Sequence, residues 1–503
     1  MKSLTSLFFL SFILLNIYFF INPVLHGDVN FLSDVARDFL LLREIDQKKI
    51  ILIGPRSNSN GLFHGPLWSY INYPIYRLGK GNPVVVGWFW IAMAISSLGI
   101  GFYIAKKLFG VLAGLTFTLL YATNFITHIN GMFHSDAPIY LTPFLFFSML
   151  LYVERKNIRY LVLHLFFASM IIQLNVGVGI PVLILSTILS LYLIFKRRSW
   201  KHLSAFLILP LCLINFIVFD IRHSFLLTKS AYAFWQLQKT WNPLPLSFWL
   251  MNRFNETINL RVILSDNFYL QIFIFLLTVI LTVIELKKSS KFKSVYLLIL
   301  YYYLGYMLLT FTNKGVILSH FVYFLAPLST LWFASFVRGK YKTLMVAILI
   351  VISVFNLQQS VTFIKRLQTD FIGKRQESWK ALSLVAETIT NRQGKNPFGY
   401  FVFSPDAFAY GPRYAMLYNF EKAKASSFEY VKKDVTYIVA APAPPGDPYM
   451  NYVWWRKNPV KITSEPKFTE NFPGGFTIEE YQLSQTEQLI PHDKTIELGI
   501  HFR

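Results

Sequence analysis

Long apolar runs recur along the first 357 residues and are separated by short polar segments. Crossing the hydrocarbon core of a bilayer takes roughly 20 apolar residues in a helix. The pattern therefore predicts an α-helical polytopic membrane protein with about eleven transmembrane helices, within a range of about nine to thirteen. The first run is longer than the apolar core of a usual signal peptide, so we expect an uncleaved first helix. The eleven runs cover approximately 4–21, 83–105, 108–126, 137–153, 160–173, 176–195, 203–219, 267–286, 295–312, 316–336 and 343–357.

A different pattern follows residue 357. Apolar residues at helical spacing predict an amphipathic helix over 376–392 and a second helix over 412–420. The Pro- and Gly-rich stretch 442–446 predicts a turn or an extended loop. We therefore divide the chain into a multi-span transmembrane domain, 1–357, and a small C-terminal α/β domain, 358–503. Runs of β-branched and aromatic residues predict strands at 400–403, 435–440 and 476–483.

The composition agrees with a membrane protein. Apolar residues make up 54% of the chain and charged residues 15%, whereas soluble proteins carry about 25% charged residues. This composition argues against a soluble enzyme of this size. The only cysteine is Cys212, so neither an intrachain disulfide nor a cysteine-based metal cluster can form.

The distribution of charge predicts the orientation of the chain in the bilayer. The net charge is +22, from 48 basic and 26 acidic residues. If the N-terminus lies inside, the short loops on that side hold 17 basic and 2 acidic residues, which accounts for +15. This asymmetry follows the positive-inside rule, and it lacks the clustered, aromatic-interleaved pattern of a nucleic-acid surface. We expect a multi-pass protein of a bacterial inner membrane, with a cytoplasmic N-terminus, an extracytoplasmic C-terminal domain and no nucleic-acid partner.

The loop between the first two spans, residues 22–82, is too long for a simple connector. Apolar residues recur at helical spacing from 31 to 45, which places Asp34, Arg37 and Asp38 on one face of a helix. The serine before Asp34 could cap this helix. Two interpretations are open: a surface helix with an intrahelical Asp34–Arg37 pair, or part of a functional site.

Three short motifs resemble motifs of one enzyme superfamily. Residues 34–38, Asp-Val-Ala-Arg-Asp, resemble an acidic first-loop motif in which Arg follows Asp by three positions. His64-Gly65-Pro66-Leu67 resembles a His/Lys-Pro-Pro-Leu element, and Ser135-Asp136-Ala137-Pro138 resembles a second acidic site written Asp-Ala-Pro. In this order, and on one predicted side of the membrane, the motifs resemble the C-type glycosyltransferases that use polyprenyl-phosphate sugars. That superfamily contains the protein O-mannosyltransferases and the aminoarabinose transferases, and the likeness covers roughly residues 1–340.

The resemblance implies an inverting membrane glycosyltransferase. Its donor would be a hexose or pentose on a polyprenyl phosphate, and its acceptor a hydroxyl of a lipid, a glycan or a protein outside the cytoplasm. By resemblance Asp34 is the general base and Asp136 a second catalytic carboxylate. The candidate groups for binding the substrate and its phosphate are Arg37, Asp38, His64, Arg56, Lys314 and His320.

Simpler interpretations of three of these residues are also open. Asp136 could be the N-cap of an apolar span, Lys314 an interfacial anchor and His320 a core histidine. We expect no cofactor, and a divalent metal is the open alternative. His134 and Asp136 could supply two ligands, but the histidines lack a zinc spacing such as His-Glu-x-x-His.

Two other classes of function compete with the glycosyltransferase hypothesis. A transporter or flippase of a cell-envelope lipid or glycan precursor would place ionisable residues deep within its spans and interrupt its helices. Here the spans are nearly free of charge, and the charged residues of interest collect at one membrane face. A non-enzymatic scaffold subunit would work through the C-terminal domain and would tolerate changes in the first loop.

Overall fold

The computed structural model describes residues 2–500, except 58, 129–131, 241–243, 265–266, 289–291, 406–407 and 443–451. Most of the turn predicted at 442–446 therefore lies outside the described residues. The chain forms two compact units, one of residues 1–21, 51–71 and 89–363, and the other of residues 22–50, 72–88 and 364–503. The division predicted after residue 357 stays a prediction, because parts of the first loop group with the C-terminal residues.

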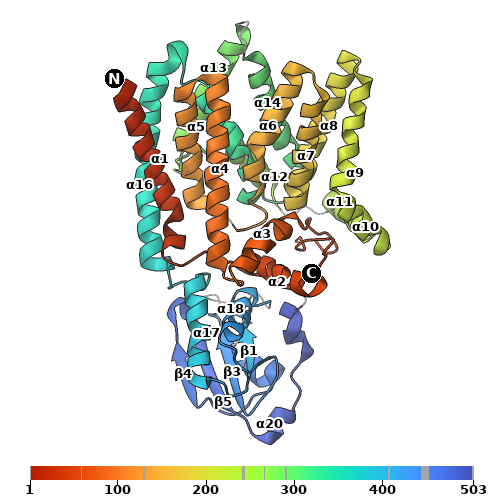
Figure 1. The fold of residues 1–503 in the computed structure, drawn as a ribbon, viewed down its shortest axis with the longest axis vertical. Helices are drawn as coiled ribbons and strands as arrows, with labels where there is room; N and C mark the ends of the chain where they lie inside the picture. Colours follow the sequence, from red (N-terminus) through yellow and green to blue (C-terminus); the bar gives the residue numbers. More distant parts are fainter. Residues whose placement is uncertain are drawn as a thin grey trace. The chain divides into compact units, whose positions relative to one another are not determined.

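Apolar helices dominate the structure (Figure 1). Among the described residues, six helices are long and apolar enough to cross a membrane, and a pair bent by 53° would make a seventh. These helices confirm an α-helical polytopic membrane protein, but they do not confirm eleven spans. Three predicted runs form helices that are too short to meet that criterion, namely Val111–Ile126, Ile158–Leu174 and Tyr323–Ala334.

The helices that lie in the first unit, or that cross its boundary with the second unit, follow the predicted apolar runs. Two further helices, α11 and α12, lie between the predicted runs 203–219 and 267–286. The helices are α1 (Lys2–Leu25), α4 (Pro83–Phe109), α5 (Val111–His128), α6 (Pro138–Arg155), α7 (Ile158–Leu174), α8 (Val176–Arg197), α9 (Ile208–Cys212), α10 (Ile214–Arg222), α11 (Leu226–Thr240), α12 (Leu246–Ile258), α13 (Phe268–Lys287), α14 (Lys293–Leu309), α15 (Ala326–Ala334) and α16 (Lys342–Arg366).

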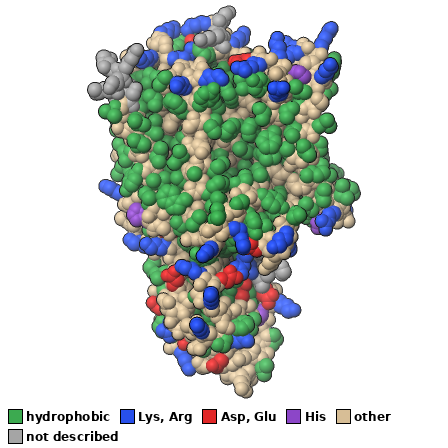
Figure 2. Space-filling model, viewed as in Figure 1, with side chains coloured by type: hydrophobic (Ala, Val, Ile, Leu, Met, Phe, Trp, Pro, Cys, Tyr) green, Lys and Arg blue, Asp and Glu red, His purple; other side chains and the backbone are tan. Residues whose placement is uncertain are grey.

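An apolar belt covers the helical bundle, and Lys and Arg side chains gather at the upper end of the visible face of this bundle (Figure 2). Large apolar side chains such as Leu207, Leu211 and Ile280 remain more than half exposed. Apolar surface of this extent on a bundle is covered by lipid in a membrane protein. The chain is therefore a multi-pass membrane protein.

A chain of hydrogen bonds joins four helices inside the bundle. His164 of α7 bonds through Nδ1 to the carbonyl oxygen of Leu145 (2.9 Å), so Nδ1 carries the proton. Its Nε2 then accepts from the hydroxyl of Tyr302 (3.0 Å), whose oxygen accepts from Ser186 (3.1 Å). Because every group in the chain has a partner, these polar residues hold α6, α7, α8 and α14 together without leaving an uncompensated charge.

The C-terminal residues build a five-stranded sheet of order β2-β1-β3-β5-β4. Strands β1, β2 and β3 are parallel, whereas β5 runs antiparallel to β3 and to β4. The structure confirms the small α/β domain. The strands are β1 (Phe398–Phe403), β2 (Ser427–Glu429), β3 (Val435–Ala440), β4 (Phe468–Asn471) and β5 (Thr477–Gln482).

Alternating side chains of β1 cover both faces of this sheet. Phe398 and Tyr400 pack on Phe420 of helix α18 (Tyr410–Lys422), with ring centroids 5.2 and 5.1 Å apart. Phe403, on the other face, packs on Trp455 at 5.3 Å. Both faces are therefore buried, and helix α17 (Trp379–Gln393) lies with α18 beside the sheet (Figure 1).

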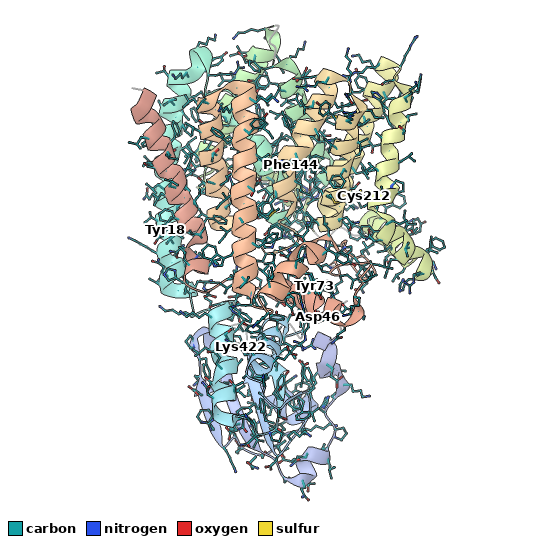
Figure 3. The ribbon with its side chains drawn as sticks, in the orientation of Figure 1. Tyr18, Asp46, Tyr73, Phe144, Cys212 and Lys422 are labelled. Carbon is teal, nitrogen blue, oxygen red and sulfur yellow. The ribbon has the colours of Figure 1, made fainter. Side chains whose placement is uncertain are left out.

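The helix predicted in the first loop is α2 (Ser33–Lys48), and it belongs to the second unit. Leu32 occupies its N-cap position and makes no capping hydrogen bond with its side chain. Ser33 is the first residue of the helix, so the prediction that it is the N-cap is wrong. Near the other end of α2, the carboxylate of Asp46 accepts a hydrogen bond from the hydroxyl of Tyr73 in α3 (Leu67–Leu78), at 2.7 Å. Figure 3 shows these two side chains pointing toward one another.

Candidate functional site

The acidic face of α2 forms as its sequence predicts. Arg37 pairs with Asp34 at 2.8 Å and approaches Asp38 at 3.5 Å. Asp38 is fully buried and Arg37 nearly so, whereas the side chain of Asp34 is 56% exposed. The guanidinium therefore holds one carboxylate that is accessible to a substrate.

In the other unit, a hairpin carries Arg56 and His64. Its strands meet at the bridge between Arg56 and Phe63, and the amide of Gly54 donates to the carbonyl oxygen of His64 (2.8 Å). A Cβ atom on Gly54 would stand 2.2 Å from the carbonyl oxygen of Gly65. Only glycine at position 54 permits this approach, which sets the position of His64.

Gly65 explains why this chain departs from the Pro-Pro of the related motif. A Cβ atom at position 65 would meet the Oε1 of Gln173 at 1.9 Å and its backbone at 2.7 Å. The backbone after His64 therefore lies directly against the end of α7. A side chain on residue 65 would displace the histidine from the bundle.

His64 and His134 lie together although 70 residues of sequence separate them. Their ring centroids are 4.6 Å apart, and both side chains are buried. The Nδ1 of His64 accepts from the backbone amide of Val176 (3.2 Å) at the start of α8. In its neutral form this imidazole therefore carries its proton on Nε2.

Asn175 connects the two motifs. Its Oδ1 caps α8 by accepting from the amide of Val178 (3.3 Å), and its Nδ2 donates to the carbonyl oxygen of Ser135 (3.3 Å). The hydroxyl of Ser135 bonds to the Nε2 of His134 (3.1 Å). One side chain thereby places the Ser-Asp-Ala-Pro segment beside the histidine hairpin.

Asp136 lies in the turn before α6. Its Oδ1 is buried and has no hydrogen-bond partner among the described residues. Burial raises the pKa of Asp136 to about 8. The hydroxyl of Tyr140, one turn later, is also buried without a partner within the described chain, so this region holds two polar groups that can bond to a ligand.

His320 lies near the same histidines. Phe133 packs on His134 and on His320, with ring centroids 4.7 and 5.8 Å away.

Arg261, which the sequence analysis did not single out, is nearly buried. It pairs with Glu256 at 2.5 Å and lies over the ring of Tyr323 at 5.9 Å. A lone arginine in an irregular loop gives no periodic signal, so the pattern could not single out Arg261.

Lys314 lies in a turn that α12 holds in place. Arg253 donates to the carbonyl oxygens of Asn313 (2.6 Å) and Gly315 (2.6 Å), and Trp249 donates to the carbonyl of Asn313 (3.0 Å). Arg253 is itself only 1% exposed. This arginine therefore supports the backbone on both sides of Lys314.

The candidate residues fall into two sets. The acidic helix with Asp34, Arg37 and Asp38 belongs to the second unit. The first unit holds the other five predicted residues: Arg56, His64, Asp136, Lys314 and His320. Over the described part of the chain, no group of three or more His, Cys, Asp or Glu side chains is arranged to hold a metal ion.

Comparisons with known proteins show the fold. The chain is similar to the crystal structure of ArnT from Cupriavidus metallidurans bound to undecaprenyl phosphate, with a TM-score of 0.62 and 10% sequence identity. This match covers 96% of this chain and 99% of ArnT. The apo state of the same protein gives a TM-score of 0.60 at 9% identity, over 95% of this chain and 98% of ArnT.

At these identities the likeness concerns the fold, and it extends over nearly the whole of both chains. The search of protein-family models gave no match. The search of curated proteins gave no match either. The chain thus has the fold of ArnT, and this fold agrees with the resemblance that the short motifs indicate.

Proposed function

We propose that the chain is an integral-membrane glycosyltransferase that moves a sugar from a polyprenyl phosphate to an acceptor hydroxyl. The observation that carries this proposal is the fold shared with ArnT along almost the full length of both chains. The acidic helix and the buried histidine and aspartate motifs support it. The proposal covers a hexose or a pentose as the donor sugar. It covers a lipid, a glycan or a protein as the acceptor.

Asp34 acts as the general base in this proposal. Its half-exposed carboxylate takes the proton of the acceptor hydroxyl while the ion pair with Arg37 keeps it oriented. The acceptor oxygen then bonds to the anomeric carbon from the face opposite the phosphate. The bond from that carbon to the phosphate oxygen breaks, its electron pair leaves with the polyprenyl phosphate, and the configuration inverts.

The other candidate residues bind the donor and stabilise the departing phosphate. Arg56, Lys314, His320 and the Nε2–H of His64 supply positive charge or hydrogen bonds. Asp136, which burial keeps protonated at neutral pH, donates a hydrogen bond as a carboxylic acid. These groups provide the chemistry of the transfer, so the proposal includes no metal or organic cofactor.

The proposed orientation follows the positive-inside rule. The N-terminus is cytoplasmic, and the C-terminal domain lies outside a bacterial inner membrane. The excess of Lys and Arg in the short loops on one predicted side of the membrane supports this orientation.

Purified protein in lipid nanodiscs tests the proposal with a panel of labelled polyprenyl-phosphate hexoses and pentoses and an envelope extract as acceptor. We expect release of polyprenyl phosphate by the wild type and a loss of at least about 100-fold in Asp34→Asn, since general-base catalysis contributes about 10²–10⁴-fold. Asp46→Asn is the matched control on the same helix. Consumption of no donor by the wild type contradicts the function, and wild-type rates in Asp34→Asn contradict the base.

A further inference from the structure

The segment that follows α1 carries a fully buried carboxylate, Asp28. Its Oδ2 accepts from the hydroxyl of Ser378 (2.6 Å) and the amide of Gly373 (3.0 Å). Its Oδ1 accepts from the amides of Lys380 (3.1 Å) and Val29 (2.8 Å). Three of these four donors lie about 350 residues further along the chain and flank the start of α17. A buried charge with this many hydrogen bonds is strongly held, and removal of its charge leaves donors without an acceptor.

The backbone around Asp28 is paired with the same C-terminal segment. The amide of Phe31 donates to the carbonyl of Glu377 (2.7 Å), and the amide of Trp379 donates to the carbonyl of Val29 (3.2 Å). Asn30 and Ser378 form an antiparallel bridge. The Oγ of Ser378, which donates to Asp28, also caps α17 by accepting from the amide of Ala381 at 3.1 Å. The carboxylate therefore joins the entry to α2 with the first turn of α17.

Helix α2 begins directly after this junction. The ring of Phe31 packs on Phe39 of α2, on Trp379 of α17 and on Tyr414 of α18, with centroids 5.2, 5.0 and 5.4 Å away. Further along α2, Arg43 forms a two-pronged ion pair with Glu421 of α18, with one contact of 2.6 Å. Both ends of the helix are thus fastened to α17 and α18.

The acidic face lies between these two attachments. Asp34 and Asp38 follow the Asp28 junction and precede Arg43, and a helix fixed at both ends holds the intervening side chains in one orientation. Asp28 touches neither Arg37 nor either of these carboxylates in any contact that the structure shows. Its effect on them passes through the backbone of α2.

We propose that Asp28 is a positioning residue that locks the start of α2 to α17, so that the C-terminal domain carries the acidic helix of the reaction. The proposal rests on the proposed function, in which Asp34 is the base. It assigns the C-terminal domain a role in positioning the base. Misplacement of a reacting group by about 1 Å costs up to about 100-fold in rate, so loosening of this attachment lowers kcat.

Two measurements on the full-length protein in nanodiscs test this inference. The first is hydrogen–deuterium exchange of the α2 amides in Asp28→Asn, which keeps the shape of the side chain and removes its charge. The second is kcat and the donor KM, measured well below the unfolding temperature. We expect faster exchange over 34–45, a fall in kcat of about 10- to 100-fold, and a donor KM within twofold of wild type.

Glu480→Gln is the matched control. Glu480 accepts hydrogen bonds from Tyr437 (2.6 Å) and Arg392 (3.0 Å) within the same domain, and it has no role in the proposed reaction. This variant is expected to lower the unfolding temperature while leaving exchange of α2 and kcat unchanged. A fall in kcat that only follows the folded fraction, or equal effects in both variants, overturns the proposal.

Ser378→Ala keeps the test decisive if Asp28→Asn does not fold. It removes the hydroxyl that donates to Asp28 and caps α17. We expect smaller increases in the exchange of α2 and a smaller fall in kcat than in Asp28→Asn. Unchanged exchange over α2 in this variant overturns the positioning role, and so does looser exchange with wild-type kcat. An inactive wild type instead contradicts the proposed function, while the exchange measurement still decides whether Asp28 fastens α2.

Discussion

The hydroxyl of Tyr121 donates a hydrogen bond to the carbonyl oxygen of Ile139 at 3.1 Å. Pro143 has no backbone N–H, so Ile139 lacks its helical donor four residues later. Tyr121 replaces that donor from α5, and Ser97 in turn donates to Tyr121 (3.0 Å). The first turn of α6, which follows Asp136, is therefore completed by a side chain from another helix.

Tyr121→Phe leaves the buried carbonyl of Ile139 without a donor. We expect a loss of about 1–3 kcal/mol in the free energy of unfolding, measured as a lower unfolding temperature in detergent. Tyr192→Phe is the control, because Tyr192 is exposed and its hydroxyl accepts a hydrogen bond from the exposed Lys196 one turn later. Equal shifts in the two variants would contradict the role of Tyr121.

The carboxyl group of Asp136 predicts a pH dependence. Burial raises its pKa from 3.8 to about 8, so between these values the folded chain binds more protons than the unfolded chain. The stability that this group contributes is full below about pH 4 and is lost as the pH rises to about 8. The unfolding temperature of wild type relative to Asp136→Asn should therefore fall between pH 5 and pH 8. Parallel curves for the two proteins would show that Asp136 titrates at its ordinary pKa.

Gly65→Ala places a methyl group where Gln173 already lies. Because part of the clash is with backbone, we expect destabilisation of about 1–3 kcal/mol and a weakened donor interaction through displaced His64, read as an increased donor KM. Gly99→Ala makes the same chemical change at a glycine of α4 that has nothing within 4 Å of the new methyl group. That control should be neutral or slightly stabilising. If Gly65→Ala were as stable as the wild type and its donor KM were unchanged, the close approach of Gly65 to Gln173 would be refuted.

Arg253→Lys keeps the charge and loses the planar fork that reaches several carbonyl oxygens. We expect about 1–3 kcal/mol of destabilisation and a higher donor KM, because the turn of Lys314 loses its support. Arg155→Lys, at an exposed arginine bonded to Tyr160, should change neither quantity. The measurements are thermal unfolding and donor titration of the transfer rate, and an unchanged KM in Arg253→Lys would separate this turn from donor binding.

Local patterns predicted much of the fold. The strand expected over 435–440 is β3, because its β-branched and aromatic residues favour an extended chain. The helices expected over 376–392 and 412–420 are α17 and α18. The three residues of β2 and four of β4 are too few for such a signal. These strands exist because the neighbouring strands pair with them.

The candidate site also has one part that the sequence predicted and one part that it did not. The Asp34–Arg37 pair is local, three residues apart on one helix, and the sequence predicted it correctly. The contact of His64 with His134 depends on the cap at Asn175 and the absent side chain at Gly65, which no periodicity encodes. The roles of these residues in transfer stay predictions, whereas the transporter hypothesis gained no support from the comparisons of fold.

The two outer strands of the sheet limit how the C-terminal domain can hold an acceptor. Strand addition needs a long, free row of backbone donors and acceptors at a sheet edge. Here the edge strands are β2 and β4, and at about 3.3 Å per residue each presents a row of roughly 10–13 Å. Short edges of this kind also discourage pairing with other chains. On the described part of this domain, an extended peptide would therefore find only a short row of backbone groups with which to pair.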